Sequence, residues 1–137
     1  MVIADTGFWL ALANRRDQHH EAAKQALDQL SEPLITTWPV MTETCHLLLF
    51  RLGNMAQERF VASFRDGAFR AFSLQSEHAP RIADLMQRYR NLPMDLADAS
   101  LVILAEDLGD GRILSTDRRD FDAYRWKQRE PFENLLF

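Results

Sequence analysis

Short apolar runs of strand character alternate with longer helical patterns along this chain of 137 residues. The runs MVIAD, LITT and RILST each predict a strand, and a further strand is expected within AFRAFSL. Strands that alternate with helices predict an α/β fold, in which a mainly parallel sheet carries helices on both faces. The crossovers should be right-handed, and functional groups should gather beyond the carboxyl ends of the strands.

Capping and stop residues set the bounds of the expected helices. Asp17 is a candidate N-cap, Pro39 suits the first turn of a helix, and Gly53 is a typical stop. The tail that begins at Tyr124 is expected to hold one or two edge strands. The helices are expected over residues 8–14, 17–30, 39–53, 55–66, 79–90 and 96–108.

Length and composition predict a single globular domain over residues 1–137. Apolar residues make up 47% of the chain, which contains no linker and no internal repeat. The single cysteine, Cys45, excludes an internal disulfide and fits a reducing compartment. No apolar run approaches the roughly 18–20 residues of a membrane span, and the first residues lack a signal-peptide pattern. We therefore expect a cytoplasmic protein with no membrane association.

The net charge and the missing motifs exclude several function classes. A formal charge of −4 argues against a simple nucleic-acid-binding protein, which usually carries a basic face. It does not exclude an enzyme that meets nucleic acid through metal ions. The chain contains no dinucleotide fingerprint, no P-loop and no nucleophile elbow.

Four acidic residues occupy comparable positions relative to the expected strands. Asp5 ends the first strand and Asp117 follows the fourth, whereas Glu43 and Asp98 lie in early turns of helices. A sheet wound as expected can bring all four to one edge. Carboxylates without a basic partner would repel one another and destabilise the fold. A divalent cation resolves this conflict, and ligands that are all oxygen favour Mg²⁺ or Mn²⁺.

Each acid also has a structural interpretation. Asp5 could cap the helix that follows it, Glu43 could be a solvated helix residue, and Asp117 could be an ordinary turn residue. Asp95 and Asp98 could form a capping box, with Asp95 at the N-cap. Each structural interpretation is the better one for its residue alone. Together they do not explain why the acids fall at the same end of successive strands.

The histidines are weaker candidates for chemistry. His19 and His20 are adjacent on an expected helix and are predicted to be surface residues. His46, three residues after Glu43, is predicted to be a partly buried structural histidine, with metal ligation as the alternative.

Four segments in this order resemble the successive motifs of PIN-domain ribonucleases: IADTGFWLAL, TETCHLLL, LADASLVILAEDLG and ILSTDRRDF. The similarity extends from Met1 to about Tyr124, nearly the whole chain. It is strongest to the VapC-type toxins of bacterial toxin–antitoxin systems, and it is specific through the order and spacing of the segments.

The resemblance implies a three-layer α/β/α fold with a central sheet of about five strands. It also implies an endoribonuclease that hydrolyses RNA phosphodiester bonds and depends on Mg²⁺ or Mn²⁺. The catalytic and metal-binding quartet of the family corresponds to Asp5, Glu43, Asp98 and Asp117.

Hydroxyl, acidic and basic residues flank this quartet. Thr6 and Thr116 match the hydroxyl residues that hold ligands in place in the family. Asp95 adds a carboxylate that is expected to lie near the metal without binding it directly. RNA phosphates are expected to contact basic side chains beside the predicted site, namely Arg15, Arg16, Arg118 and Arg119.

The resemblance also implies partners for this protein, and two other functions remain to be weighed against it. Toxin-type members pair with a small VapB-like antitoxin whose tail occludes the site, and they commonly form homodimers. The alternative is a catalytically inactive module on the same fold, which binds RNA or protein and is separated from the enzyme only by activity. A receiver-like signalling domain needs an aspartate after the third strand, and FSLQSE offers none.

Overall fold

A computed structural model describes residues 1–137, and every predicted strand run forms a strand. The four strands are β1 (Val2–Ala4), β2 (Leu34–Thr37), β3 (Phe69–Phe72) and β4 (Arg112–Leu114). The edge strand β7 (Glu133–Asn134) completes a five-stranded sheet in the order β3-β2-β1-β4-β7. All four pairings in this sheet are parallel, as the alternation of strands and helices predicts.

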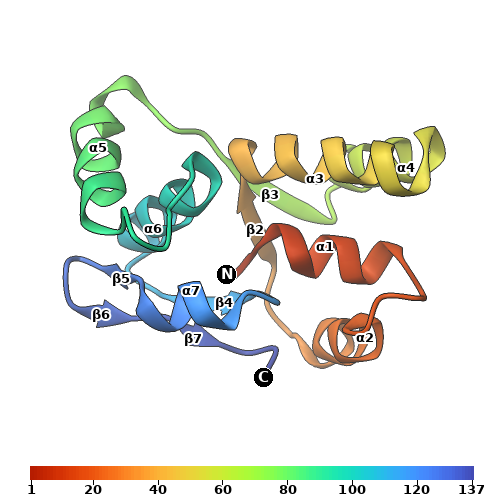
Figure 1. Cartoon of the computed structure of the whole chain (residues 1–137). Coiled ribbons are helices and arrows are strands. Elements are labelled where there is room, and N and C mark those ends of the chain that lie inside the picture. The colour runs from red at the N-terminus through yellow and green to blue at the C-terminus, as the bar shows by residue number, and fades with distance from the viewer.

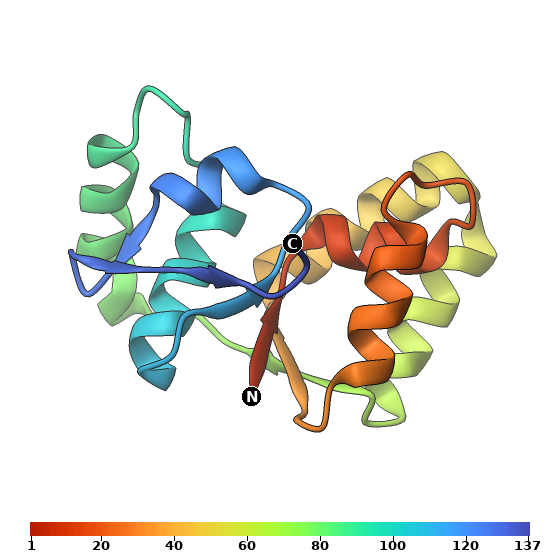
Figure 2. The same cartoon turned by 90° about the horizontal axis from the view of Figure 1, so that it is seen from below.

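Helices cover both faces of the sheet, and two perpendicular views show the same division (Figures 1 and 2). One side carries α1 (Thr6–Ala13), α2 (His20–Gln29), α3 (Trp38–Leu52) and α4 (Asn54–Arg65). The other side carries α5 (Ala79–Arg88), α6 (Leu96–Leu108) and α7 (Arg118–Ala123). A single 3₁₀ turn, η1 (Ser76–His78), precedes α5. The three-layer α/β/α prediction is confirmed.

Local signals in the sequence account for most helix ends. The Thr37 hydroxyl accepts from the Val40 N–H at 3.3 Å and caps α3, with Pro39 in the first turn. Gly53 ends α3 with φ of +95°, a backbone conformation that side chains disfavour. Gly109 ends α6 in the left-handed region, as a typical C-terminal stop.

The starts of two helices need correction, and one helix was not predicted. The helix expected from Asp17 begins at His20, because the Asp17 carboxylate accepts from the His19 N–H at 2.8 Å in the preceding turn. The helix expected from residue 8 begins at Thr6, directly after its cap Asp5. The short helix α7 was not expected at all, because six residues carry too little periodicity to predict one.

The tail contributes one strand to the main sheet rather than two. β5 (Arg125–Trp126) and β6 (Glu130–Pro131) pair antiparallel in a separate two-stranded sheet. Only β7 joins the main sheet, beside β4. The prediction of one or two edge strands is therefore wrong in number, because the tail holds three short strands, of which only one joins the main sheet.

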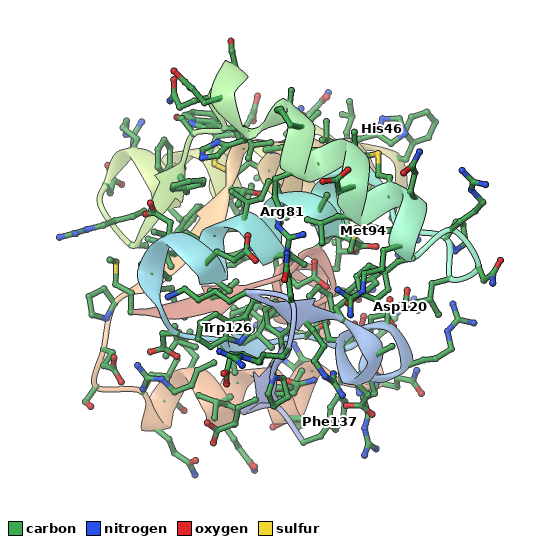
Figure 3. All side chains as sticks on the ribbon, turned by 90° about the vertical axis from the view of Figure 1, so that its left-hand side faces the viewer. His46, Arg81, Met94, Asp120, Trp126 and Phe137 are labelled. Carbon is green, nitrogen blue, oxygen red and sulfur yellow. The ribbon has the colours of Figure 1, made fainter.

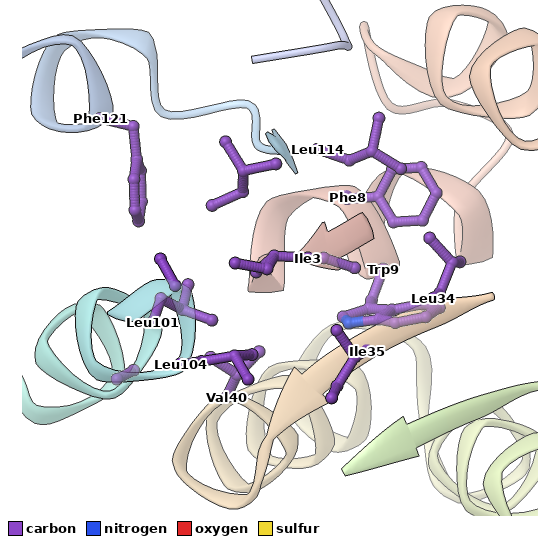
Figure 4. Close-up of a cluster of buried hydrophobic side chains, with 14 of the residues drawn as sticks. Ile3, Phe8, Trp9, Leu34, Ile35, Val40, Leu101, Leu104, Leu114 and Phe121 are labelled. Carbon is purple, nitrogen blue, oxygen red and sulfur yellow. The ribbon is translucent and has the colours of Figure 1, made fainter. Parts of the chain in front are cut away.

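The core lies where α6 and α1 pack on the central strands (Figure 4). Ile3 and Leu114 of the two central strands are fully buried, as are Leu101 and Leu104 of α6. Burial of each such side chain stabilises the fold by about 1.5–3 kcal/mol. Because α6 is apolar on nearly all sides, it is held firmly against the sheet, and its first turn is fixed with it.

The amino end of the sheet is closed by an ion-pair network. Arg112, at the start of β4, binds Glu32 and also Asp110, the latter at 2.7 Å. Glu32 also accepts from the N-terminal ammonium at 3.1 Å. Hydrogen bonds from Arg112 lower the pKa of Glu32 to about 2 and hold the pKa of Asp110 below its usual value. Glu32 and Asp110, at this end of the sheet, are thus compensated by Arg112.

A second ion pair, between Arg81 and Glu106, ties α5 to α6; Arg81 is labelled in Figure 3. Arg81 donates to both carboxylate oxygens of Glu106, at 3.1 and 2.8 Å. No helix of the chain is long and apolar enough to cross a membrane.

Candidate active site

Asp5 lies where β1 ends and α1 begins, and its side chain is buried. Its two carboxylate oxygens accept from the Thr6 N–H at 2.7 Å and from the Ser115 hydroxyl at 2.9 Å. The pKa of Asp5 is raised to about 6, mainly by burial and to a lesser extent by the charges of Glu43 and Asp117, although both hydrogen bonds lower it. Asp5 therefore caps α1, and it also faces other acids.

Ser115 joins the ends of the two central strands and was missed by the sequence analysis. Its buried hydroxyl donates to Asp5 and accepts from the Asp117 N–H at 3.0 Å. Asn134 of β7 fixes the backbone of Ser115 from the other side, with hydrogen bonds of 3.2 and 2.8 Å. This one residue holds two of the four predicted acids.

Thr116, expected to support a ligand, makes no hydrogen bond to an acid. Its hydroxyl lies against Gly7, where an added Cβ would come within 1.9 Å of Thr116 Oγ1. Gly7 therefore permits the loop after β4 to approach α1 closely. The expected role of Thr116 in holding a ligand stays a prediction.

Asp98 points from the first turn of α6 and is held by a residue far along the chain. The hydroxyl of Tyr124 donates to Asp98 Oδ2 at 2.9 Å. The pKa of Asp98 is raised to about 8, mainly by burial and also by the charges of nearby acids, of which Asp95 has the largest effect, whereas the hydrogen bond from Tyr124 lowers it. An acid with this pKa is mostly protonated at neutral pH unless a cation compensates its charge.

Asp95 caps α6, as the capping-box interpretation predicts. Its carboxylate accepts from the Asp98 N–H at 2.8 Å. The reciprocal bond of a capping box is not formed, and the Asp98 carboxylate accepts from Tyr124. Asp95 and Asp98 thus have separate tasks.

Asp117 caps the unexpected helix α7 rather than occupying an ordinary turn. Its carboxylate accepts from the Asp120 N–H at 3.1 Å, and burial raises the pKa of Asp117. Asp120 is a buried acid that the sequence analysis missed, and Arg119 pairs with it at 3.0 Å. The charge of Asp120, the second acid of the DRRD segment, is therefore compensated by Arg119.

Glu43 is half-buried on α3, and its charge acts on Asp5. It lines an open groove of about 910 Å³ between the start of α3 and the start of α6. Trp38, His46 and Asp95 also line this groove. His46 is exposed and packs on Phe50 at a centroid distance of 4.7 Å, so the prediction of a partly buried histidine is wrong.

His19 and His20, which were predicted to be surface residues, are both partly buried. His20 is half-buried, and its Nδ1 lies 2.7 Å from the carbonyl oxygen of Ala11. His19 is also half-buried and packs edge-to-face on Phe137.

The four predicted acids gather at the carboxyl edge of the sheet, and none forms an ion pair with a basic side chain. Their mutual influence is direct, since Glu43 and Asp117 act on the pKa of Asp5, and Asp5 acts on that of Asp98. No three acidic, histidine or cysteine side chains are close enough to hold a metal ion in this arrangement.

The donor chemistry of the site nevertheless fits a hard divalent cation. Its carboxylates are uncompensated and partly desolvated, and all the donors are oxygen. The hydroxyl of Thr6, next to Asp5, is buried and has no hydrogen-bond partner. A buried polar atom without a partner is costly, and a ligand at this site could relieve that cost.

The four predicted RNA-binding arginines differ in their freedom. Arg15 and Arg16 are exposed between α1 and α2 and form no ion pair. Arg118 packs over the Phe137 ring at 4.8 Å. Arg119 pairs with Asp120 and donates to the Leu92 carbonyl at 3.2 Å, so it is engaged within the fold.

Arg51 is a further basic residue beside the site that the sequence analysis missed. It lines a polar pocket of about 440 Å³ together with Gln18, His19 and Thr116. Arg51 lies in the last turn of α3 and is distant in sequence from Asp5, Asp98 and Asp117, so no motif indicates it.

Comparisons with known proteins support the resemblance read from the sequence. A family model described as "PIN domain" matches residues 2–127. Ribonuclease VapC26 of Mycobacterium tuberculosis is 27% identical over 124 residues, which cover 90% of this chain and 92% of that protein. The crystal structure of M. tuberculosis VapC20, described as a sarcin–ricin loop cleaving toxin, matches with a TM-score of 0.79 and 22% identity. This match covers 87% of this chain and 92% of VapC20.

Proposed function

Because this chain belongs to the PIN-domain family, we propose that it is an endoribonuclease and the toxin of a toxin–antitoxin pair. RNA phosphodiester bonds are hydrolysed at the carboxyl edge of the sheet. The observation that carries this proposal is a set of acids that are buried or half-buried and have no basic partner. These acids are Asp5, Glu43, Asp98 and Asp117.

The proposed cofactor is Mg²⁺ or Mn²⁺, held by the carboxylates of Asp5, Asp98 and Asp117. When bound, such a cation makes water more acidic and offsets negative charge at the phosphate. Glu43 would hold a second cation or orient the attacking water. The raised pKa values of Asp5 and Asp98 support the proposal, because burial disfavours their ionised forms and a bound cation would favour them.

Other residues of the chain hold these acids in place and guide the substrate. Ser115 fixes one oxygen of Asp5 and the backbone of Asp117. We assign phosphate contacts to Arg15, Arg16 and Arg118, which are exposed and not paired with acids. Phosphate contacts of this kind position RNA without reading its sequence.

The proposed partners are a small VapB-like antitoxin and a second copy of the chain, all in the cytoplasm. Exposed apolar side chains on α3 and α4 support a protein partner, since such patches mark interaction surfaces. Phe50 is 77% exposed and Met55 is 63% exposed, and Leu49, Leu52 and Val61 are exposed near them in sequence.

A cleavage assay tests the proposed function. Wild-type protein, Asp5→Asn and Asp98→Asn are incubated with Mn²⁺ and a mixture of transfer, messenger and ribosomal RNA. The ribosomal RNA includes the sarcin–ricin loop, because VapC20 is described as cleaving it. Wild type is expected to cleave at discrete positions and both variants to fail. Glu32→Gln, an acid change at the opposite end of the sheet, is the control. Equal activity in all four proteins would contradict the proposal.

A further inference from the structure

Tyr124 reaches the site from the end of α7, beyond the last motif of the sequence. Its side chain is fully buried, and its hydroxyl donates to Asp98 Oδ2 at 2.9 Å. A buried tyrosine hydroxyl usually finds a partner, and most side-chain hydrogen bonds are made to backbone or water. Here the partner is instead a carboxylate of the proposed active site.

The Tyr124 ring is held firmly by aromatic neighbours. It packs edge-to-face on Tyr89 at 5.0 Å and on Phe121 at 5.2 Å. The next residue, Arg125, donates its backbone N–H to the Tyr89 hydroxyl at 2.9 Å. The Lys127 N–H in turn binds the Glu106 carboxylate of α6. The position of the Tyr124 hydroxyl is therefore set by packing, independently of any bound cation.

This contact fixes one oxygen of Asp98 and leaves the other available. Asp98 Oδ2 accepts from Tyr124, whereas Oδ1 makes no hydrogen bond within the protein. Asp5 is held in a comparable way, by the Thr6 N–H and the Ser115 hydroxyl. Partners of this kind orient a carboxylate before it meets a cation, and their loss typically weakens metal binding.

We propose that Tyr124 is a positioning residue, whose hydroxyl holds the Asp98 carboxylate in the orientation that binds the divalent cation. The inference deepens the proposed function and rests on it. The competing explanation is that Tyr124 only fills the core and that Asp98 merely satisfies its hydroxyl. Deletion of that hydroxyl separates the two explanations, because only the positioning role affects cation binding.

The test is the Mn²⁺ affinity of Tyr124→Phe, measured by titration calorimetry. Tyr89→Phe is the matched control, since it removes a hydroxyl from the same aromatic cluster whose partner is a backbone N–H. Tyr124→Phe is expected to weaken Mn²⁺ binding by about 10- to 100-fold and Tyr89→Phe by less than about twofold. Melting temperatures without metal, measured first, set an assay temperature at which every variant is folded.

Two further readouts distinguish positioning from packing. Tyr124→Phe is expected to lower kcat for RNA cleavage by about tenfold or more, while KM changes by less than about twofold. The double variant Asp98→Asn/Tyr124→Phe is expected to bind Mn²⁺ no more weakly than Asp98→Asn alone, because Tyr124 acts through Asp98.

Different failures have different meanings. If wild type binds Mn²⁺ and cleaves RNA but Tyr124→Phe matches Tyr89→Phe, the positioning role is overturned and the proposed function stands. Additive losses in the double variant would also overturn the positioning role. If wild type neither binds Mn²⁺ nor cleaves RNA, both proposals are overturned.

Discussion

The two ends of the parallel sheet carry acids in opposite electrostatic states. At the amino end, Glu32 and Asp110 share Arg112, and its hydrogen bonds lower both pKa values. At the carboxyl end, Asp5 and Asp98 have no basic partner, and burial raises their pKa values to about 6 and 8. The same two strands, β1 and β4, run between these ends.

This difference separates acids that stabilise the fold from acids that cost stability. An acid paired with arginine gains from being charged in the native state. Ionisation of a buried acid that lies among other acids destabilises the native state. Such an acid is therefore expected where something else, such as a bound cation, favours its charge. The unpaired set is therefore the better candidate for function, although both ends are rich in carboxylates.

The largest expected effect contrasts the two aspartates that flank β4. Asp117→Asn keeps an oxygen that can cap α7 but removes the charge. It is expected to lower RNA cleavage with Mn²⁺ by more than the roughly 100-fold typical of losing an outer-shell partner. Asp110→Asn, two residues before the other end of the strand, should leave cleavage within about twofold of wild type. Equal losses in initial-rate assays would remove the functional distinction between the two ends.

The pH dependence of stability is the next largest expected effect. Because Asp5 and Asp98 have raised pKa values, the native state holds more protons than the unfolded state between about pH 4 and pH 8. Metal-free protein should therefore lose stability as pH rises, with a melting temperature lower by about 5 °C or more at pH 8 than at pH 5. Glu32 and Asp110 act oppositely, and they add stability as pH rises through about 2 to 4.

Asp98→Asn sharpens this prediction, because it removes the acid with the highest of these pKa values. Melting curves recorded in chelator should show a shallower decline from pH 5 to pH 8 in the variant. A wild-type melting temperature that is level or rises over this range would contradict the uncompensated state of the carboxyl end.

Loss of the shared arginine should affect the fold but not the chemistry. Arg112→Met removes the donor that Glu32 and Asp110 share, while it keeps an unbranched side chain. The melting temperature at pH 7 is expected to fall by about 2–5 °C, a modest effect because the network is partly exposed. Cleavage by the folded variant should match wild type. A loss of activity at a temperature well below its melting point would contradict the structural role.

The smallest expected effect concerns Asp95, which lies beside the acids but caps a helix. Asp95→Ala should cost about 1 kcal/mol of unfolding free energy, whereas Asp95→Asn should cost a few tenths at most. Both variants should retain cleavage. Denaturant unfolding measures the first expectation and initial rates the second. If Asp95→Asn loses activity but keeps its stability, Asp95 contributes its charge to catalysis, which contradicts a role limited to capping the helix.

Strand ends were predictable because they follow from local pattern. Each apolar run ends at a residue that the sequence displays directly, so Asp5 and Asp117 could be assigned to one edge of the sheet before any coordinates were known. The layered fold followed from the alternation of strands and helices, and α6 was recognisable by its long apolar body.

Contacts between distant segments were not predictable in this way. Ser115 rather than its neighbour Thr116 binds Asp5, and this choice depends on the register of β4 against β1, which pairs Leu114 with Ala4. Tyr124 meets Asp98 across 26 residues, through the packing of the tail on α6. No periodicity or short motif carries such information.

Thermal unfolding with and without Mn²⁺ tests the central claim most directly, because that claim is that the acids at the carboxyl end, which have no basic partner, bind a divalent cation. At pH 7.5, millimolar Mn²⁺ should raise the melting temperature of wild type by several degrees, since a ligand at about 100 times its Kd adds roughly 2.7 kcal/mol. Asp98→Asn should respond far less, and Arg112→Met should respond like wild type. The claim would be contradicted if Mn²⁺ left the melting temperature of wild type unchanged, or if it raised the melting temperatures of wild type and Asp98→Asn equally.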